Sequence, residues 1–515
     1  MGFIADEVTL RALLEHRAAR EPDRAYLVHR GGSLTLSDLD AAVNRLANGL
    51  AARGVGEGTR VAVMLDNHPD LVCLFFALAK LGAVQVPVNT RLKADPLAYL
   101  LAHANPAVVI AESGYAPVVE TAIVDGTVSL VWRAGADDAP ARGAPVFREL
   151  QAASDAPPPG LPTASHVLTV LYTSGTTGPP KGVLVTDKMH RASAAASAMA
   201  ADVRPDDVMY LWEPLYHIGG LQVLVLALEH DVTIVLGDRF SASGFWREVR
   251  GSGATQIHFL GGILQMLLAQ PPRVDDRDHR VRVAWGGGAP ADVWRAFEAR
   301  FGVQVRESYG MTEASSLTSI NVDARFGTVG RPAPWFDVRI AGDDGAFLPP
   351  GASGEILVRE REPGLITPGY FRDPEATARA IRDGWLHTGD LGCLDEQGYL
   401  HFRGRLKDCV RHRGENVSAW EIERVVERHD SVEECAVVGV PGAVGEEDIK
   451  LFVKPRQGAV FDSDTVFDWC AEHLADYQVP RYLAVVDGFE KTGTQRIRKE
   501  TLARTTEDCR ERNHG

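Results

Sequence analysis

Segments with the spacing of helices and strands alternate along the first hundred residues of this 515-residue chain. Apolar residues recur at helical spacing from Ser37, the expected N-cap, to Gly54, where the helix should end. Residues 61–65 and 84–88 have the continuous apolar character of buried strands, and residues 71–80 between them indicate a further helix. This order predicts a parallel sheet covered by helices.

The pattern changes along the rest of the chain. Residues 134–164 are rich in Ala, Pro, Gly and Asp, which indicates a surface connection. A second α/β stretch runs from about residue 200 to 320, and short β-like runs broken by glycine and proline follow it. We therefore predict an α/β fold in which residues 1–404 form a large N-terminal domain of two helix-flanked sheets plus a small β-rich subdomain. Residues 405–408 then lead to a small α+β domain at 409–515.

Composition narrows the class of partner. The net charge of −15 disfavours a general nucleic-acid or anionic-membrane surface. The six cysteines form no CxxC pair, so neither a disulfide framework nor a zinc site is indicated, and a reducing, cytoplasmic location fits. The N-terminus lacks the features of a signal peptide, and the most apolar stretch, around residues 71–84, is too short to span a bilayer. We expect no nucleic-acid partner and no membrane span.

The most informative segment is a glycine-rich loop that follows a predicted strand at residues 167–172. It reads Thr173-Ser174-Gly175-Thr176-Thr177-Gly178-Pro179-Pro180-Lys181-Gly182. Glycines expose backbone N–H groups, hydroxyls add donors and Lys181 adds charge, so the loop is suited to a polyphosphate. A glycine rather than Ser or Thr follows the lysine, so the loop is not a Walker A motif. The alternative is a flexible surface turn.

This loop resembles the phosphate loop of the acyl-adenylate-forming superfamily, which includes acyl-CoA synthetases, firefly luciferase and the adenylation domains of peptide synthetases. Similar segments recur in the family's order along essentially the whole chain, and together they are highly specific. They are residues 214–217, 286–290, 309–313, 385–390, 404–408, 414–417 and 421–423. The resemblance implies an AMP-forming acyl-CoA ligase that joins a carboxylic acid to coenzyme A through acyl-AMP, with ATP and Mg²⁺. It also implies that residues 405–408 are a hinge and that the C-terminal domain is a mobile lid.

The resemblance implies a site for AMP and ATP in which distant segments converge on one nucleotide. Glu313 is the implied ligand of Mg²⁺, which prefers carboxylate and phosphate oxygens. Asp390 would accept hydrogen bonds from the ribose hydroxyls, and Arg405 would donate to ribose and phosphate. The alternatives are a solvated helix carboxylate for Glu313 and a turn residue for Asp390. The full implied set is Thr173, Ser174, Gly175, Thr176, Thr177, Lys181, Gly288, Ala289, Pro290, Ser308, Tyr309, Gly310, Met311, Thr312, Asp390 and Arg405.

The same comparison implies an acyl pocket and a surface for coenzyme A. His217 resembles the family's gate residue beside the acyl pocket, and Lys407 of the hinge segment is a further expected catalytic residue. His217 could instead be an ordinary core histidine, and the aromatic residues nearby could be plain core. The expected acyl pocket is Trp212, Tyr216, His217, Phe259, Gly261 and Gly262, and the expected CoA segment is Arg413, Gly414, Glu415 and Asn416. Two glycines among aromatic residues favour a bulky apolar acid.

One position departs from the family in a way that bears on mechanism. The family carries a lysine near its C-terminus that bridges the carboxylate and the α-phosphate during adenylation, whereas this chain reads Gln495-Arg496 in place of Gly-Lys. Arg496 keeps the charge, but a planar fork is not equivalent to an ammonium point charge. We hypothesise weakened adenylation with efficient transfer of a supplied acyl-adenylate to CoA. The alternative is that Arg496 serves adequately, or that Lys491 or Lys499 replaces it.

Other functions remain open at this stage. The protein could be a full ATP-dependent acyl-CoA synthetase, or an adenylation enzyme that loads a separate carrier protein. It could also bind acyl-AMP without turnover, although the retention of Glu313, Asp390, Arg405 and Lys407 argues against decay. If adenylation is weak, a separate adenylating partner enzyme would supply the acyl-adenylate.

Overall fold

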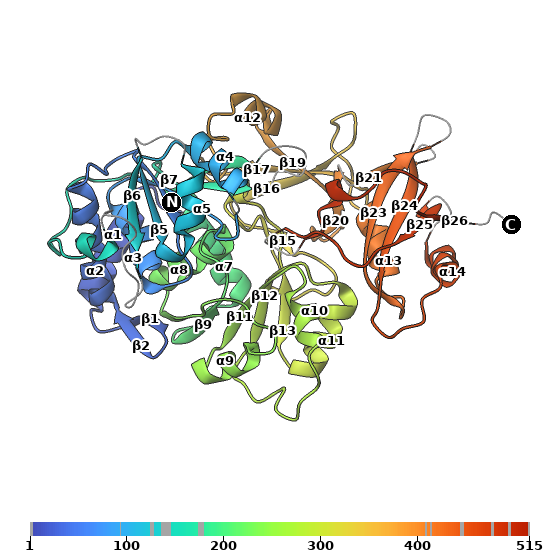
Figure 1. Ribbon diagram of the computed structural model, residues 1–515, viewed down its shortest axis with the longest axis horizontal. Coiled ribbons are helices and arrows are strands. Elements are labelled where there is room, and N and C mark those ends of the chain that lie inside the picture. Colours follow the sequence, from blue (N-terminus) through green and yellow to red (C-terminus); the bar gives the residue numbers. More distant parts are fainter. Residues whose placement is uncertain are drawn as a thin grey trace. The chain divides into compact units, whose positions relative to one another are not determined.

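The structure is a computed structural model (Figure 1), and it describes residues 4–92, 94–123, 128–134, 146–173, 180–406, 409–412, 415–442, 447–474, 478–492 and 496–512. The chain forms two compact units. Unit 1 comprises Met1–Gly175, Pro179–Asp337 and Val358–Leu386, and unit 2 comprises Thr176–Gly178, Val338–Leu357 and His387–Gly515. The predicted boundary at residues 404–408 thus lies within unit 2, which also takes in part of the predicted β-rich region.

Unit 1 contains two sheets that are parallel except at one edge of each. The first has the order β13-β12-β11-β9-β10-β1-β2, and only β1 and β2 pair antiparallel. The second has the order β6-β5-β3-β4-β7-β8, and only β7 and β8 pair antiparallel. The strands are β1 (Ala25–His29), β2 (Gly32–Thr35), β3 (Arg60–Met64), β4 (Val84–Pro87), β5 (Val108–Glu112), β6 (Ser129–Arg133), β7 (Val167–Thr173), β8 (Lys181–Thr186), β9 (Asp207–Leu211), β10 (Val232–Leu236), β11 (Gln256–Leu260), β12 (Val283–Gly287) and β13 (Gln304–Glu307). The predicted helix-flanked parallel sheets are confirmed.

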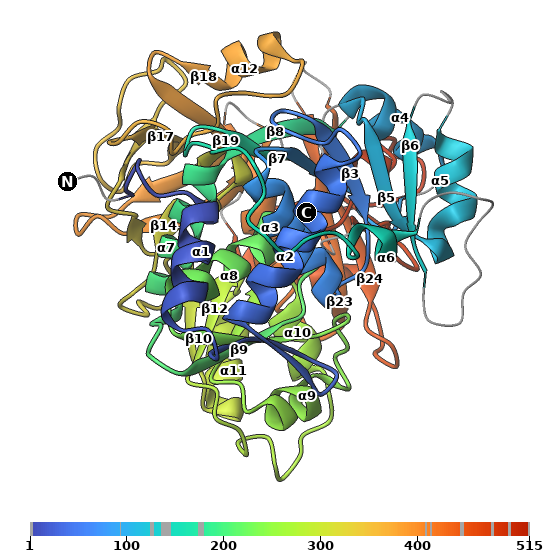
Figure 2. The ribbon, with the colours of Figure 1, turned by 90° about the vertical axis from the view of Figure 1, so that its left-hand side faces the viewer.

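Helices cover these sheets. Figure 2 shows α4 and α5 beside β5 and β6, where their apolar residues share one core with the second sheet. Helix α8 is buried from Gly219 to Leu228, and all of these residues except Gln222 are glycine or apolar. The helices of unit 1 are α1 (Leu10–Arg20), α2 (Leu36–Ala51), α3 (Pro69–Lys80), α4 (Ala94–Ala104), α5 (Ala116–Ala122), α6 (Phe147–Leu150), α7 (Asp187–Ala201), α8 (Ile218–Glu229), α9 (Phe245–Ser252), α10 (Ile263–Leu268), α11 (Ala291–Phe301) and α12 (Pro374–Ala380).

The start of α2 corrects the sequence analysis. The N-cap is Thr35 rather than Ser37. The Thr35 hydroxyl accepts the N–H of Asp38 at 3.1 Å, and the Asp38 carboxylate accepts the N–H of Thr35 at 3.1 Å. This reciprocal capping box satisfies two backbone N–H groups at the start of the helix. Ser37 is too close to Asp38 in sequence to form the same box with it.

Residues 336–405 carry a sheet of order β16-β17-β19-β18, with β20 paired to β19. Its strands are β16 (Phe336–Ala341), β17 (Gly354–Glu360), β18 (Ile381–Arg382), β19 (Trp385–Leu394) and β20 (Leu400–Arg405). The C-terminal part has a hairpin, a four-stranded sheet and two helices: β21 (Cys409–His412), β22 (Glu415–Ser418), β23 (Val432–Pro441), β24 (Glu447–Pro455), β25 (Tyr482–Val485), β26 (Arg510–Glu511), α13 (Ala419–Val426) and α14 (Ser463–His473). This is the predicted α+β domain.

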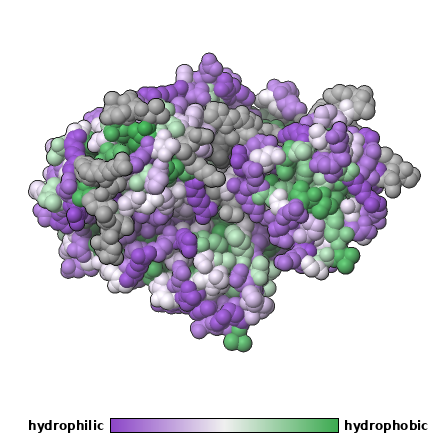
Figure 3. All heavy atoms as spheres, viewed as in Figure 1, coloured by the Kyte–Doolittle hydropathy of each residue, from purple (hydrophilic) through white to green (hydrophobic). Residues whose placement is uncertain are grey.

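Side-chain alternation in β23 separates two cores of this domain. Val437 packs with residues of α13 and α14, such as Ile422 and Phe467. Its neighbour Val438 points to the opposite face and packs with Phe452. Apolar side chains gather over β23–β25 in Figure 3. Among the described residues of both units, no helix is long and apolar enough to cross a membrane.

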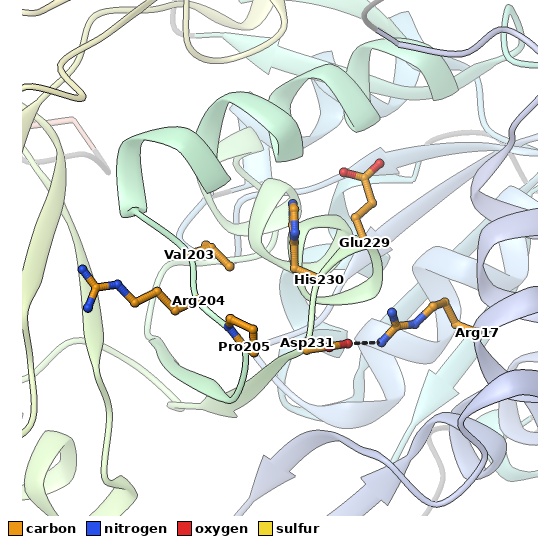
Figure 4. Close-up of a pocket in the computed structure, with 7 residues that line it drawn as sticks. All are labelled: Arg17, Val203, Arg204, Pro205, Glu229, His230 and Asp231. Carbon is orange, nitrogen blue, oxygen red and sulfur yellow. Dashed lines mark hydrogen bonds and ion pairs between the residues drawn. The ribbon is translucent and has the colours of Figure 1, made fainter.

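A polar cavity of about 210 Å³ lies at the C-terminal end of α8 (Figure 4). It is lined by Arg17, Val203, Arg204, Pro205, Glu229, His230 and Asp231, and Arg17 pairs with Asp231 at 2.9 Å. Burial raises the pKa of Glu229 to about 7, and Asp187 adds to the shift while Arg191 opposes it. The folded state is therefore more stable with Glu229 protonated than with Glu229 charged.

We expect Glu229→Gln to stabilise the protein above neutral pH and to change little below pH 4.5. The pKa of Glu229 in the folded state, about 7, lies above its usual value of 4.5. Between pH 4.5 and about 7, the folded state therefore keeps a proton on Glu229 that the unfolded state has lost. The free energy of unfolding consequently falls as the pH rises through this range. The gain should be on the order of 2 kcal/mol at pH 8. Urea unfolding at pH 5 and pH 8 measures it, with the exposed Glu120→Gln as the control. An equal gain at both pH values would contradict the assignment.

Candidate active site

The two ends of the glycine-rich loop lie on neighbouring antiparallel strands. Thr173 ends β7, Lys181 begins β8, and the two residues are cross-strand partners. The loop therefore returns into a strand rather than opening a helix, which separates it structurally from a Walker A loop. Four further predicted nucleotide contacts lie outside the described residues: Ser174, Gly175, Thr176 and Thr177.

Three side chains of unit 1 that are far apart in sequence form a connected polar group. The Tyr370 hydroxyl donates to Glu313 Oε1 at 2.9 Å. The ammonium of Lys181 lies over the Tyr370 ring, 5.0 Å from its centroid. A cation above an aromatic face is attracted by the negative charge of the ring centre. Tyr370 thus links the two charged groups that the sequence analysis assigned to phosphate and metal.

The backbone around Glu313 fixes its position. Glu313 belongs to a short 3₁₀ turn, Thr312–Ala314, and its carbonyl accepts the N–H of Thr367 at 2.8 Å. Glycine is required just before this turn, because a Cβ at Gly310 would lie 1.7 Å from the carbonyl oxygen of Ser316. The side chain is 7% exposed. A carboxylate oxygen is the type of ligand that Mg²⁺ prefers.

We expect Tyr370→Phe to lower the rate of acyl-adenylate formation about 10-fold. The change removes the donor that orients Glu313 and keeps the ring beneath Lys181, and losing the partner of a metal-binding group typically costs 10- to 100-fold. Pyrophosphate release at varied Mg²⁺ concentration measures the effect. Tyr482→Phe, the same substitution on strand β25 of unit 2, is the control. An unaltered Mg²⁺ dependence in Tyr370→Phe would argue against this role.

An acid that was not predicted as a site residue holds the predicted nucleotide contacts Gly288 and Ala289. Glu307 accepts the N–H groups of Gly288 and Ala289 at 3.1 and 2.9 Å. Pro290 follows as the N-cap residue of α11. Next to Glu307 in sequence, Ser308 is buried, and its hydroxyl has no hydrogen-bond partner within the described ranges. Such an unsatisfied hydroxyl is uncommon in a folded interior and is suited to a ligand.

The nucleotide segment that follows lies in unit 1 as well. Tyr309 is buried, and its carbonyl accepts the N–H groups of Thr318 and Ser319 at 2.8 and 2.9 Å. Met311 and Thr312 are half-buried and lead into the 3₁₀ turn of Glu313. This run therefore leads directly into the residue that is the candidate metal ligand.

His217 occupies the start of α8. It is the N-cap residue, its Nε2 has no hydrogen-bond partner in the part of the chain that the structure describes, and its ring meets the Tyr216 ring edge-on at 4.6 Å. Burial lowers the pKa of His217 to about 4, so the imidazole is neutral at pH 7. Gly261 and Gly262 are partly exposed between β11 and α10. These residues are available to line a pocket.

Trp212 and Phe259 lie on the face of the first sheet that α9, α10 and α11 cover. Both belong to the apolar cluster formed with α9, α10 and α11, and Phe259 is fully buried there. The Trp212 indole N–H donates to the carbonyl of His258 at 3.1 Å. These surroundings fit the alternative stated above, that the aromatic residues belong to the hydrophobic core.

Asp390 and Arg405 meet in unit 2. They are cross-strand partners on β19 and β20, and Arg405 Nε lies 3.2 Å from Asp390 Oδ1. Asp390 is buried, and its N–H donates to the Thr388 hydroxyl at 3.1 Å. Glu355 supports the same turn, because its two oxygens contact His387 Nδ1 at 2.8 Å and the N–H of Gly389 at 3.1 Å. The antiparallel hairpin thus brings together two predicted ribose contacts that lie 15 positions apart.

The remaining predicted residues lie in the C-terminal part. Lys407, Arg413 and Gly414 lie outside the described residues, while Glu415 and Asn416 belong to β22 and pair with His412 and Arg411. Arg496 is exposed, and its backbone is fixed by Thr492, whose N–H donates to the Arg496 carbonyl at 2.8 Å.

Comparisons with known proteins identify the family. The AMP-binding enzyme family matches residues 14–371, and the AMP-binding enzyme C-terminal domain matches residues 421–496. The chain belongs to the AMP-binding enzyme family. The prediction of an acyl-adenylate-forming, AMP-forming ligase is confirmed at this level, and Arg496 is the last residue of the C-terminal match.

Individual relatives cover nearly the whole chain. Crotonobetaine/carnitine–CoA ligase of Salmonella arizonae is 32% identical over 90% of this chain and 92% of its own length. The ATP-bound MatB of Rhodopseudomonas palustris is 29% identical, with a TM-score of 0.87 over 96% of this chain and 97% of its own. The o-succinylbenzoate CoA synthetase of Bacillus subtilis with magnesium and ATP is 27% identical, with a TM-score of 0.83 over 95% and 98%.

Proposed function

We propose that this AMP-forming acyl-CoA ligase is specialised for its second half-reaction, in which acyl-AMP and CoA give acyl-CoA and AMP. Adenylation of the free acid by ATP is weakened. The observation that carries the proposal is Arg496, which stands at the end of the C-terminal family match where the resemblance places a lysine.

The local structure favours a changed contact at this position. The backbone N–H of Arg496 donates to the Thr492 hydroxyl at 3.1 Å, and the Thr492 N–H donates to the Arg496 carbonyl at 2.8 Å. These bonds hold the Arg496 backbone, and from it the longer and planar guanidinium presents its charge differently from a lysine ammonium. A group that stabilises charge developing in the transition state is sensitive to such a shift.

The two neighbouring lysines are already engaged. Lys499 pairs with Glu423 at 2.7 Å, and Glu423 also accepts the N–H of Val437 at 2.6 Å. Lys491 forms an ion pair with Glu434. Either lysine would have to leave its acidic partner to replace the missing ammonium. This favours Arg496 over both lysines as the residue present during adenylation.

The rest of the nucleotide machinery supports binding of an adenylate. We propose that Glu313 holds Mg²⁺ when ATP is bound, which would neutralise phosphate charge, and that Tyr370 keeps the Glu313 carboxylate in place. Lys181 would contact phosphate oxygens. Asp390 would accept the ribose hydroxyls, and Arg405 would hold the Asp390 carboxylate in position.

The thiol step needs little from Arg496. In the proposed reaction the CoA sulfur attacks the acyl carbonyl, the bond to the phosphate oxygen breaks and AMP leaves. Lys407 and the segment Arg413, Gly414, Glu415 and Asn416 are the residues that we propose for CoA. The acid would enter beside His217 and Tyr216, and we propose a bulky, largely apolar acid. A cytoplasmic location and a separate adenylating partner remain predictions.

The test compares the two routes to one product. One reaction receives carboxylate, ATP, Mg²⁺ and CoA, and the other receives synthetic acyl-AMP and CoA, with acyl-CoA quantified in both. We expect the second route to be faster by about 10²-fold or more. Equal turnover numbers would overturn the proposal. A parallel reaction with a phosphopantetheinylated carrier protein in place of CoA tests the carrier alternative, and acyl-AMP binding without any thioester would indicate a binder.

A further inference from the structure

Three buried side chains form a polar cluster on the face of the first sheet that meets α8. His258 on β11 and Trp285 on β12 are cross-strand partners, and their rings lie 4.2 Å apart. His258 Nδ1 is hydrogen-bonded to Glu213 Oε1. Glu213 and His258 are 1% and 4% exposed, and Trp285 is fully buried. Neither Glu213 nor His258 was predicted as a site residue.

The cluster lies beside the predicted acyl gate. Gly219 stands two positions after His217 on α8, and a Cβ at Gly219 would lie 3.5 Å from both His258 Cε1 and Leu260 Cδ1. That is ordinary van der Waals distance, so glycine leaves room there for about one methyl-sized group of a ligand. At Gly219, helix α8 therefore presents no side chain toward the His258 ring.

The segment that carries Glu213 is held rigidly. The Asn67 side-chain amide donates to the carbonyl of Glu213 at 2.9 Å, and its oxygen accepts the N–H of Leu215 at 3.1 Å. The Trp212 indole N–H fixes the carbonyl of His258 from the other face of the sheet. These bonds fix both ends of the Glu213–His258 pair before any ligand binds, which lowers the cost of recognition.

Two polar atoms of the cluster are unsatisfied. Glu213 Oε2 and Trp285 Nε1 are buried and have no hydrogen-bond partner within the described ranges. Leaving a buried donor or acceptor unpaired costs about 1–3 kcal/mol, and more for a charged group. Native interiors pair nearly all such atoms, so an unpaired acceptor and an unpaired donor around one histidine ring require an explanation.

We propose that Glu213, His258 and Trp285 select an acid that carries a hydroxyl group. A hydroxyl can donate to Glu213 Oε2 and accept from Trp285 Nε1, so it satisfies both atoms. An ammonium group would pair only with Glu213, and a methyl group would satisfy neither. The inference rests on the proposed acyl-CoA ligase function and refines its substrate: a bulky, largely apolar acid with one hydroxyl at the end that enters beside Gly219.

The experiment supplies the acids as synthetic acyl-adenylates with CoA, so weak adenylation does not enter. Cinnamates that carry hydroxyl, methyl or aminomethyl at ring position 2, 3 or 4 are compared by kcat/KM. We expect one hydroxyl position to exceed its methyl counterpart by at least about 10²-fold, because a site built to bind a hydroxyl rejects analogues without it. No hydroxyl preference at any position, or a preference for aminomethyl, overturns the proposal.

Variants locate the preference in the cluster. Trp285→Phe removes the indole N–H and should reduce the hydroxyl preference to less than about tenfold, and Glu213→Gln should do the same. Gly219→Ala should retain the melting temperature, since alanine is favoured over glycine in a helix, but should lower kcat/KM for the preferred hydroxy acid. If Glu213→Gln fails to fold, the other two variants decide. An undiminished preference in folded Trp285→Phe would contradict the assignment.

The two proposals fail in different ways. If the half-reaction proposal is wrong, the ATP route and the acyl-AMP route run equally fast for every acid, whatever the ring substituent. If the specificity proposal is wrong, hydroxyl and methyl acids run equally in the acyl-AMP route, whatever the ratio between routes.

Discussion

The double substitution Gln495→Gly and Arg496→Lys should raise the rate of adenylation by about 10²–10³-fold, the usual value of one charge-stabilising contact in a transition state. It restores the ammonium point charge and removes the side chain before it, while the loop closed by Thr492 remains. Isotope exchange between pyrophosphate and ATP in the presence of the acid measures adenylation without the thiol step.

The matched control is Arg498→Lys, two residues further on. Arg498 is also an exposed arginine, and it pairs with Glu490 and Glu500. We expect it to leave the exchange rate unchanged. Transfer from supplied acyl-AMP to CoA should be altered less than about threefold in both variants, since the account assigns Arg496 to adenylation alone. A parallel gain in both half-reactions would contradict that division.

Removing the charge of Glu313 should lower adenylation by about 10²-fold or more. Glu313→Gln keeps the shape and an oxygen that can accept from the Tyr370 hydroxyl, so the fold should be retained. A neutral amide is a poor ligand for Mg²⁺ beside phosphate oxygens, and the loss should be partly overcome by raising the Mg²⁺ concentration.

Pyrophosphate release against Mg²⁺ concentration tests this expectation, with the exposed Glu375→Gln on α12 as the control. Acyl-AMP that is supplied preformed bypasses ATP activation, so its conversion to acyl-CoA should fall far less. An equal loss in both reactions, or a loss that does not depend on Mg²⁺, would argue that Glu313 has a structural role instead.

Much of the fold follows from local patterns in the sequence. The strand at β3 and the helix at α3 fall within two residues of their predicted bounds, because apolar runs and helical spacing are local signals. The N-cap of α2 was misplaced by two residues, since both Thr35 and Ser37 have suitable hydroxyls. Only the reciprocal bond with Asp38 decides between them.

The sequence predicts less of the candidate site than of the fold. Tyr370 contacts Glu313 from 57 positions away, and no spacing rule connects a 3₁₀ turn with a segment so much later in the chain. Glu307 and Glu355 act through backbone N–H groups of distant turns, which leave no motif. Trp212 and Phe259 lie in the core because their face of the sheet is covered by α9–α11 rather than by α8. The sequence of a single strand does not specify which helices cover each face.

A single-turnover measurement tests the central claim most directly. Excess enzyme is mixed with acid, ATP and Mg²⁺ and quenched over time to follow acyl-AMP, and a second series mixes enzyme and acyl-AMP with CoA to follow acyl-CoA. We predict that acyl-AMP accumulates far more slowly than it is consumed, by about 10²-fold or more, and that the lysine variant removes this difference in rate. Formation as fast as consumption in the unaltered protein would contradict it.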